Sequence, residues 1–257
     1  MTINFYNKLL NLSSILFILI PLSLISGPFI SDLFLVIIVI NFILLSYINK
    51  KYELFKSKFL LLFLLFWLII IIVSFYSLNI KSIQSSLFYF RFGLFSLAAY
   101  ILIEEKKKIF EYILYLLLFI YLMLFIDSIY QYRFNENLLG FIYDNKNNFR
   151  ITSFFGKDEI LGSYSVRLLP LTIFLIIFNF NHEPTKKNFL LMFLTVSSSV
   201  IILLSGERTS LALFILLIIF LFISSFSIRK FLIIPIIIIM ISFTTIILNS
   251  DKIKNRI

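Results

Sequence analysis

Residues 130–170 read YQYRFNENLLGFIYDNKNNFRITSFFGKDEILGSYSVRLLP, and they form the one long polar segment of a chain that is otherwise almost entirely apolar. No window between Gln131 and Gly162 is apolar enough to cross a bilayer. Long apolar runs lie on both sides of this segment. We therefore expect residues 131–162 to form a loop outside the membrane, between two sets of membrane-spanning helices.

Composition places the whole chain in the membrane class. Hydrophobic residues make up 61% of the 257 residues and charged residues only 14%, which is typical of an integral membrane protein. A transmembrane helix needs about 20 apolar residues. Nine candidate spans lie near 9–26, 29–48, 59–78, 86–103, 109–130, 163–180, 189–205, 209–226 and 231–248. We expect an all-α, polytopic helical bundle that forms one membrane domain over residues 1–257.

Several classes of site are disfavoured by residue content. The sequence has no Cys, which removes disulfides, thiolate metal ligands and thiol nucleophiles. The single His is His182, in a short loop beside Glu183 and Pro184, so neither a zinc site nor a bound cofactor is expected. The net charge is +10, but the basic residues form no stripe with interleaved polar side chains, so nucleic-acid binding is not expected.

The basic residues instead predict the orientation of the spans. Lys and Arg are enriched in short cytoplasmic loops of membrane proteins. With the N-terminus in the cytoplasm, the cytoplasmic connections carry the larger set, and the outward segments carry fewer basic residues over greater lengths. The cytoplasmic set is Lys8, Lys50, Lys51, Lys56, Lys58, Lys106, Lys107, Lys108, Lys186, Lys187, Arg229 and Lys230. Residues 131–162 and the polar element SGERTS at 205–210 then face outward together.

Four arginines on the outward side are candidate ligand-binding groups. Arg91 lies about six residues inside the fourth candidate span, where a guanidinium faces a polar interior or extends to the outer head groups; both readings stay open. Arg208 follows Ser205 and Gly206 at the start of the eighth candidate span, a position suited to phosphate binding or to interfacial anchoring. Arg150 and Arg167 lie before and after the start of the sixth candidate span. Convergence of arginines favours an anionic, phosphate-bearing ligand.

The available outward carboxylates are Asp127, near the end of the fifth span, and the loop residues Asp158 and Glu159. They can act as a base or hold arginines in place, and we expect pairing with arginine. The serines at 197–199 are expected to pack helices together. No residue stands out as catalytic.

Two motifs resemble those of the bacterial O-antigen ligase and O-antigen polymerase family. RITSFFGKDEILGSYSVRLLPL at 150–171 is similar to the family pattern R-x-x-G-x-F-x-N-P-N-x-L-G-x-x-L…L-P-L, and SGERTSLALFIL at 205–216 resembles its S-G-S-R-[GT]-[AS]-hydrophobic element. The two have the same order and spacing as in the family, and the similarity covers mainly residues 145–225. Ser153 stands in place of the family's Gly, and Lys157, Asp158 and Glu159 stand in place of its Asn-Pro-Asn.

The resemblance implies a membrane glycosyltransferase of the bacterial inner membrane. Such an enzyme transfers a glycan from an undecaprenyl-diphosphate carrier to a lipid A-core or glycan acceptor on the periplasmic side, without a metal or cofactor. Arg150 and Arg208 match the arginines that hold the diphosphate, with Arg91 as a third contact. Secondary candidates are Arg167, Asp158, Glu159, Ser205 and Gly206. The resemblance does not separate ligase from polymerase.

In the family, a large periplasmic loop with a catalytic His follows the region that ends this chain. We therefore expect a fragment or an incomplete gene product, not active alone. The other readings are a transporter or flippase-like protein for a lipid-linked or anionic solute, and a non-catalytic scaffold in envelope polysaccharide assembly. A transporter would show repeats or broken helices; no repeat is found, but Pro170 and Pro235 are expected to interrupt spans.

Overall fold

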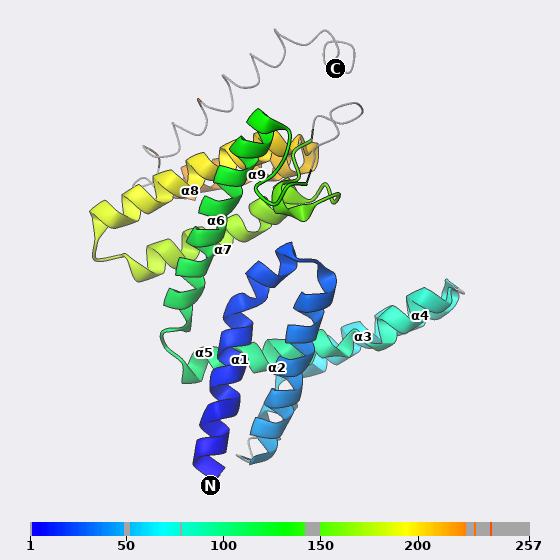
Figure 1. Cartoon of the computed structure of the whole chain (residues 1–257). Coiled ribbons are helices and arrows are strands. Elements are labelled where there is room, and N and C mark those ends of the chain that lie inside the picture. The colour runs from blue at the N-terminus through cyan, green and yellow to red at the C-terminus, as the bar shows by residue number, and fades with distance from the viewer. Residues whose placement is uncertain are drawn as a thin grey trace. The chain divides into compact units, whose positions relative to one another are not determined.

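The computed structural model describes residues 2–48, 52–77, 79–141 and 150–224, together with Arg229 and Ile237, and these residues form helices without any strand (Figure 1). The all-α class predicted from the sequence is confirmed. The α-helices are α1 (Thr2–Ile25), α2 (Pro28–Ile48), α3 (Lys58–Tyr76), α4 (Ile80–Leu87), α5 (Phe90–Glu105), α6 (Ile109–Phe134), α7 (Leu161–Asn179), α8 (Pro184–Ser205) and α9 (Arg208–Ser224), with 3-10 turns η1 (Tyr52–Lys56) and η2 (Ser153–Phe155).

Seven helical stretches in the described part of the chain are long and apolar enough to cross a membrane. One of them, Ile80–Glu105, consists of α4 and α5 in succession, and Arg208–Ile223 is a shorter apolar helix. These helices coincide with the candidate spans up to 209–226. The candidate near 231–248 lies outside the described residues. By helix length and composition, this is a multi-pass membrane protein.

The chain divides into two compact units, residues 1–112 and residues 113–257. In the first, α1 and α2 form a hairpin closed at Gly27, whose φ of 115° suits glycine. A polar contact joins the two helices inside the apolar core, because the Asn41 side-chain amide donates to Ser13 Oγ at 3.0 Å. Helix α5 packs against both.

The fourth span is broken. Helix α4 ends at Leu87 and α5 begins at Phe90, so Phe88 and Tyr89 interrupt the helix within the apolar stretch. The Trp67 indole N–H of α3 donates to the Ser86 carbonyl at 2.9 Å, and the hydroxyls of Ser74 and Ser86 lie 2.8 Å apart. The Ser86 carbonyl also accepts the Tyr89 N–H at 3.2 Å, so the Trp67 indole is a second donor to this carbonyl next to the break. Helix α3 therefore stabilises the break.

In the second unit, α7 packs against α8 and α9. Tyr121 of α6 is fully buried, and its hydroxyl donates to the Ser165 carbonyl of α7 at 2.6 Å. The serines at 197–199 are buried in α8, where their hydroxyls donate to carbonyls of their own helix.

Pro170 lies inside a continuous α7, so the expected interruption there is wrong. Pro235 is outside the described residues. A proline within a membrane helix is tolerated when neighbouring groups satisfy the backbone.

The ends of α8 follow from its sequence. Pro184 occupies the first turn, where its missing N–H costs no hydrogen bond, and Gly206 ends the helix in the left-handed conformation (φ 64°, ψ 14°). The chain then reverses into α9 within two residues. This reversal places residues 205–210 next to the beginning of α7.

Candidate functional site

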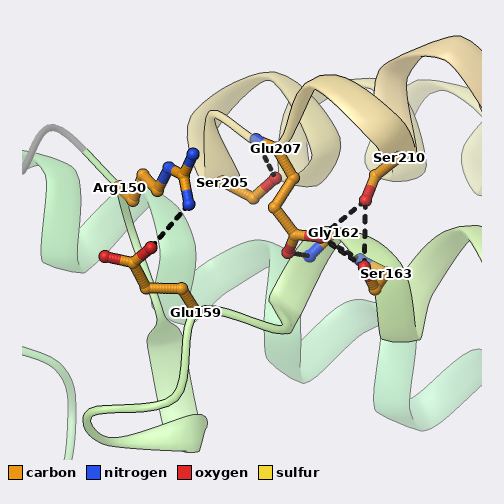
Figure 2. A network of polar contacts seen from close by, with 7 residues as sticks. All are labelled: Arg150, Glu159, Gly162, Ser163, Ser205, Glu207 and Ser210. Atoms are coloured by element: carbon orange, nitrogen blue, oxygen red, sulfur yellow. Dashed lines mark hydrogen bonds and ion pairs between the residues drawn. The ribbon is translucent and has the colours of Figure 1, made fainter.

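The two polar elements identified in the sequence meet at one end of the second unit. The Ile151 N–H donates to the Leu204 carbonyl at 3.2 Å, which ties the segment after Arg150 to the last turn of α8. The first turn of α7 lies against the α8–α9 turn, as Figure 2 shows. Residues about 50 positions apart in the sequence thus share one surface.

A buried carboxylate joins these elements. Glu207 Oε1 accepts the Gly162 N–H at 2.7 Å, and Oε2 accepts the Ser163 N–H at 3.0 Å and the Ser210 hydroxyl at 2.7 Å. The Ser163 hydroxyl also donates to Oε2. The Glu207 N–H in turn points at Ser205 Oγ, at 3.4 Å (Figure 2). We call Gly162, Ser163, Ser205, Glu207 and Ser210 the Glu207 cluster.

The cluster satisfies a helix start that has no cap of its own. Ile160, at the N-cap of α7, provides no side-chain hydrogen bond. The first N–H groups of a helix lack partners within it and attract negative charge. Glu207, in the turn between α8 and α9, supplies that negative charge to the start of α7. The geometry requires glycine at 162, because a Cβ there would lie 2.4 Å from Ser205 Oγ and 3.1 Å from Glu207 Oε1.

The same contacts decide the ionisation of Glu207. Burial acts to raise the pKa of this carboxyl, but the hydrogen bonds from the Ser163 and Ser210 hydroxyls and from the backbone N–H groups of Ser163 and Gly162 outweigh it, so the pKa is lowered from its ordinary value. Glu207 is therefore an anion at neutral pH. A carboxylate with a lowered pKa is a weak base, so its place in the site is to fix the two helices.

The arginines predicted to contact the diphosphate near this cluster differ in their exposure and in their ion pairing. Arg150 is half-buried, and its Nη1 lies 2.6 Å from Glu159 Oε2 in an ion pair (Figure 2). Arg208 is exposed at the first position of α9, and its guanidinium has no partner among the described residues. Arg167 and Asp158 are exposed as well. The end of unit two that holds the cluster therefore presents Arg208 as an exposed cation and Arg150 as a cation paired with Glu159.

A second network positions the segment that carries Arg150. Asp127, fully buried in α6, accepts the Leu138 N–H at 2.7 Å and the Ser153 hydroxyl at 2.5 Å. Gln131 Oε1 accepts the Ser153 N–H at 2.7 Å, and the Asn137 amide donates to the Ser153 carbonyl at 2.9 Å. The expectation that Asp127 pairs with an arginine is wrong. The Leu138 N–H and the Ser153 hydroxyl contact Asp127 in place of an arginine, because the chain after α6 folds back over the end of that helix.

Ser153 has a φ of 52°, in the left-handed region that favours glycine. This is the position at which the family-like motif has Gly. The three hydrogen bonds around Ser153 compensate the backbone strain of a side chain there.

Arg91 belongs to the other unit. It is the second residue of α5, and its Nη1 lies 2.8 Å from Asp32 Oδ2 of α2. Of the two readings left open by the sequence, extension to lipid head groups and a partner inside the protein, the structure gives Arg91 a partner. Asp32 did not stand out in the sequence.

The sequence also did not single out Glu207, Gly162, Ser163 or Ser210. A signal was present, since Glu207 is the one acidic residue in the polar element between two apolar helices. A carboxylate that is buried in that position, beside a helix start, needs hydrogen-bond donors from the protein. Which donors those are depends on the tertiary contact with α7, 45 residues earlier.

The described residues include no group of three His, Asp or Glu side chains arranged to hold a metal ion. In the comparisons with known proteins, no family model matches the chain, and no curated protein and no solved structure matches it.

Proposed function

We propose that this chain is a bacterial inner-membrane glycosyltransferase of the O-antigen ligase or polymerase type, and that it binds its glycan donor at one end of unit two. In this proposal nine helices cross the membrane with the N-terminus in the cytoplasm, and the end of unit two that carries Arg150 and Arg208 faces the periplasm. The donor is a glycan on undecaprenyl diphosphate, and the acceptor is a lipid or another glycan.

One observation carries the proposal: the Ile151–Leu204 hydrogen bond brings the Arg150 segment and the 205–210 element together. A lipid diphosphate keeps its tail in the bilayer and its charge at the membrane surface. Two guanidiniums at one end of a helical unit suit that geometry, because arginine binds phosphate through paired N–H groups. They would also stabilise the negative charge that develops on the departing diphosphate.

Arg150 and Arg208 would hold the donor in different ways. Arg208 is accessible, whereas Arg150 must exchange Glu159 for a phosphate oxygen. That exchange is feasible because both partners are partly exposed, at 43% and 32%, and an exposed ion pair contributes roughly 0–1 kcal/mol. An acceptor hydroxyl attacks the anomeric carbon and gives its proton to a general base, the bond from that carbon to the diphosphate oxygen breaks, and the diphosphate leaves with the bonding electron pair.

The test is binding of undecaprenyl diphosphate to the purified chain in detergent, measured by native mass spectrometry. Arg208→Ala and Arg150→Ala should each weaken binding by about ten- to a hundredfold, the range expected for losing a charge-assisted hydrogen bond. Lys186→Ala is the matched control, since Lys186 is a cation at the opposite end of α8, paired with Glu183. Unchanged binding in both arginine variants would reject the site.

A second candidate is a transporter for a lipid-linked or anionic solute. The observation that favours it is the break at Phe88–Tyr89 within the Ile80–Glu105 span, because broken helices hold substrate in many transporters. Proteoliposomes separate the two functions. A transporter moves the lipid-linked glycan between leaflets with no change in mass, whereas a transferase given an acceptor releases undecaprenyl diphosphate.

A further inference from the structure

Three large apolar side chains are exposed in the polar segment that follows α6. Leu138 and Leu139 lie at the tip of a tight turn formed by residues 137–141, which we call the 137–141 turn, and Phe141 ends it. The exposed fractions are 48% for Leu138, 67% for Leu139 and 53% for Phe141. Exposed apolar side chains that lie together mark an interaction surface.

The backbone of the 137–141 turn has an acceptor within the chain for each of its five N–H groups. Asn137 Oδ1 accepts the N–H groups of Leu139 and Phe141 at 3.0 and 2.8 Å. The Asn137 carbonyl accepts the Gly140 N–H at 2.9 Å, and the Asn137 N–H donates to the Phe141 carbonyl at 3.0 Å. The fifth N–H donates to a side chain of α6. A turn in water can leave its N–H groups to the solvent, whereas a turn against lipid must satisfy them internally.

The fifth N–H fixes the depth of the turn. It belongs to Leu138 and donates to Asp127 Oδ1 at 2.7 Å. Asp127 lies 18 residues after Ile109, the first residue of α6, which is about 27 Å along the helix axis. The basic run at 106–108, directly before α6, marks one membrane surface, because lysines favour the head-group region. Since the hydrocarbon layer is about 30 Å thick, the turn lies at its opposite edge and not beyond the end of α6.

We propose that the 137–141 turn inserts its three apolar side chains into the bilayer, at the boundary between acyl chains and head groups. The partner is the lipid surface itself, and burial of apolar area supplies the attraction. Tyr132 and Arg133, exposed further along α6, are of types that favour the same boundary. The inference requires only that α6 crosses a membrane, so it stands or falls independently of the proposed donor site.

The test measures the depth of the turn in a membrane. The sequence has no cysteine, so Leu139→Cys and Phe141→Cys each provide a single thiol for a nitroxide spin label on the full chain, reconstituted in phosphatidylcholine vesicles. Electron paramagnetic resonance compares collisions of the label with oxygen, which concentrates among the acyl chains, and with a water-soluble nickel chelate. The matched control is Lys157→Cys, at an exposed position of the same polar segment. Circular dichroism shows that each labelled variant is folded, and two positions are used so that either can decide.

The labels at 139 and 141 should lie about 5–10 Å inside the boundary, whereas the label at 157 should be open to nickel. Equal nickel accessibility at the three positions overturns the proposal. Low accessibility to both reagents, with dipolar broadening between labels, assigns the surface to a second copy of the chain and overturns it as well. Adding Asn137→Ala to Leu139→Cys removes the acceptor of two N–H groups and should move the label into water. An unchanged depth in that variant contradicts the argument from the backbone.

Discussion

Gly162→Ala tests the Glu207 cluster most directly, because the substitution adds one methyl group at a position surrounded by the cluster's own oxygens. The new Cβ would lie 2.4 Å from Ser205 Oγ, 3.0 Å from Ser210 Oγ and 3.1 Å from Glu207 Oε1. Contacts this short force the first turn of α7 away from the α8–α9 turn. The Gly162 N–H and Glu207 Oε1 are then separated.

The expected cost follows from three terms. Overpacking costs about 1–3 kcal/mol, and weakening one hydrogen bond to a charged group costs about 1.5–3 kcal/mol. Alanine is the better helix former, which returns about 0.5–1 kcal/mol. The net loss is about 1.5–5.5 kcal/mol, which for a chain of this size lowers the Tm by about 3–22 °C.

Thermal unfolding in detergent, followed by circular dichroism, measures this loss. The rescue variant is Gly162→Ala with Ser205→Ala, because removing Ser205 Oγ takes away the closest contact and should restore at least half of the lost Tm. Ser205→Ala alone serves as the control for the missing hydroxyl. If Gly162→Ala is as stable as the wild type, or if the double variant is no more stable than the single one, the packing argument is refuted.

Three further predictions address other contacts. Glu207→Gln should lower the free energy of unfolding by about 2–4 kcal/mol at neutral pH. Because the folded-state pKa of Glu207 is lowered, the stabilisation by the carboxylate is present above the unfolded pKa of about 4.3 and is lost as the pH falls through the folded pKa. The difference in stability between wild type and variant should therefore disappear in acid, and a difference of constant size contradicts this reasoning. Trp67→Phe should cost about 0.5–1.5 kcal/mol in unfolding experiments by removing the donor to the Ser86 carbonyl, and an unfolding free energy equal to that of the wild type would argue against a stabilising indole contact. Asp127→Asn should be tolerated, since an amide can still accept the Leu138 N–H and donate to Ser153 Oγ. Asp127→Ala removes both contacts and should make the segment at 150–156 sensitive to limited proteolysis. Equal proteolysis rates in the two variants would show that Asp127 does not hold that segment.

Apolar run length was sufficient to predict the helical class and most span positions, because a membrane helix must be about 20 residues of continuous hydrocarbon. It did not predict the break at Phe88–Tyr89. Those two residues are as apolar as their neighbours, and the interruption depends on Trp67 and Ser74 of α3, which pair with Ser86. A hydropathy pattern carries no record of such cross-helix hydrogen bonds.

Pro170 illustrates the opposite error. Proline removes a backbone donor, which predicts an interruption, yet α7 continues through it. Packing of α7 against α8 and α9 outweighs the local preference.

The candidate site was predictable as a location and not as a set of contacts. Arginines beside glycines in two polar elements identified the right two segments. Asp127 was expected to meet an arginine because opposite charges attract, but the groups closest to it are a loop N–H and the Ser153 hydroxyl. The path of the loop after α6 decides which donors contact the Asp127 carboxylate. That path cannot be predicted from the chemistry of single residues.

The cap of α7 has a consequence for the biosynthesis of the protein. The N–H groups of Gly162 and Ser163 receive their anion from Glu207, 45 and 44 residues further along the chain. At a synthesis rate of about 5–20 residues per second, roughly 2–9 seconds pass between translation of the helix start and translation of its partner. Throughout that interval the beginning of α7 must stay in contact with water, because the lipid interior offers no acceptor. The hairpin of α7 and α8 can therefore settle at its final depth only after α9 has begun to emerge from the ribosome.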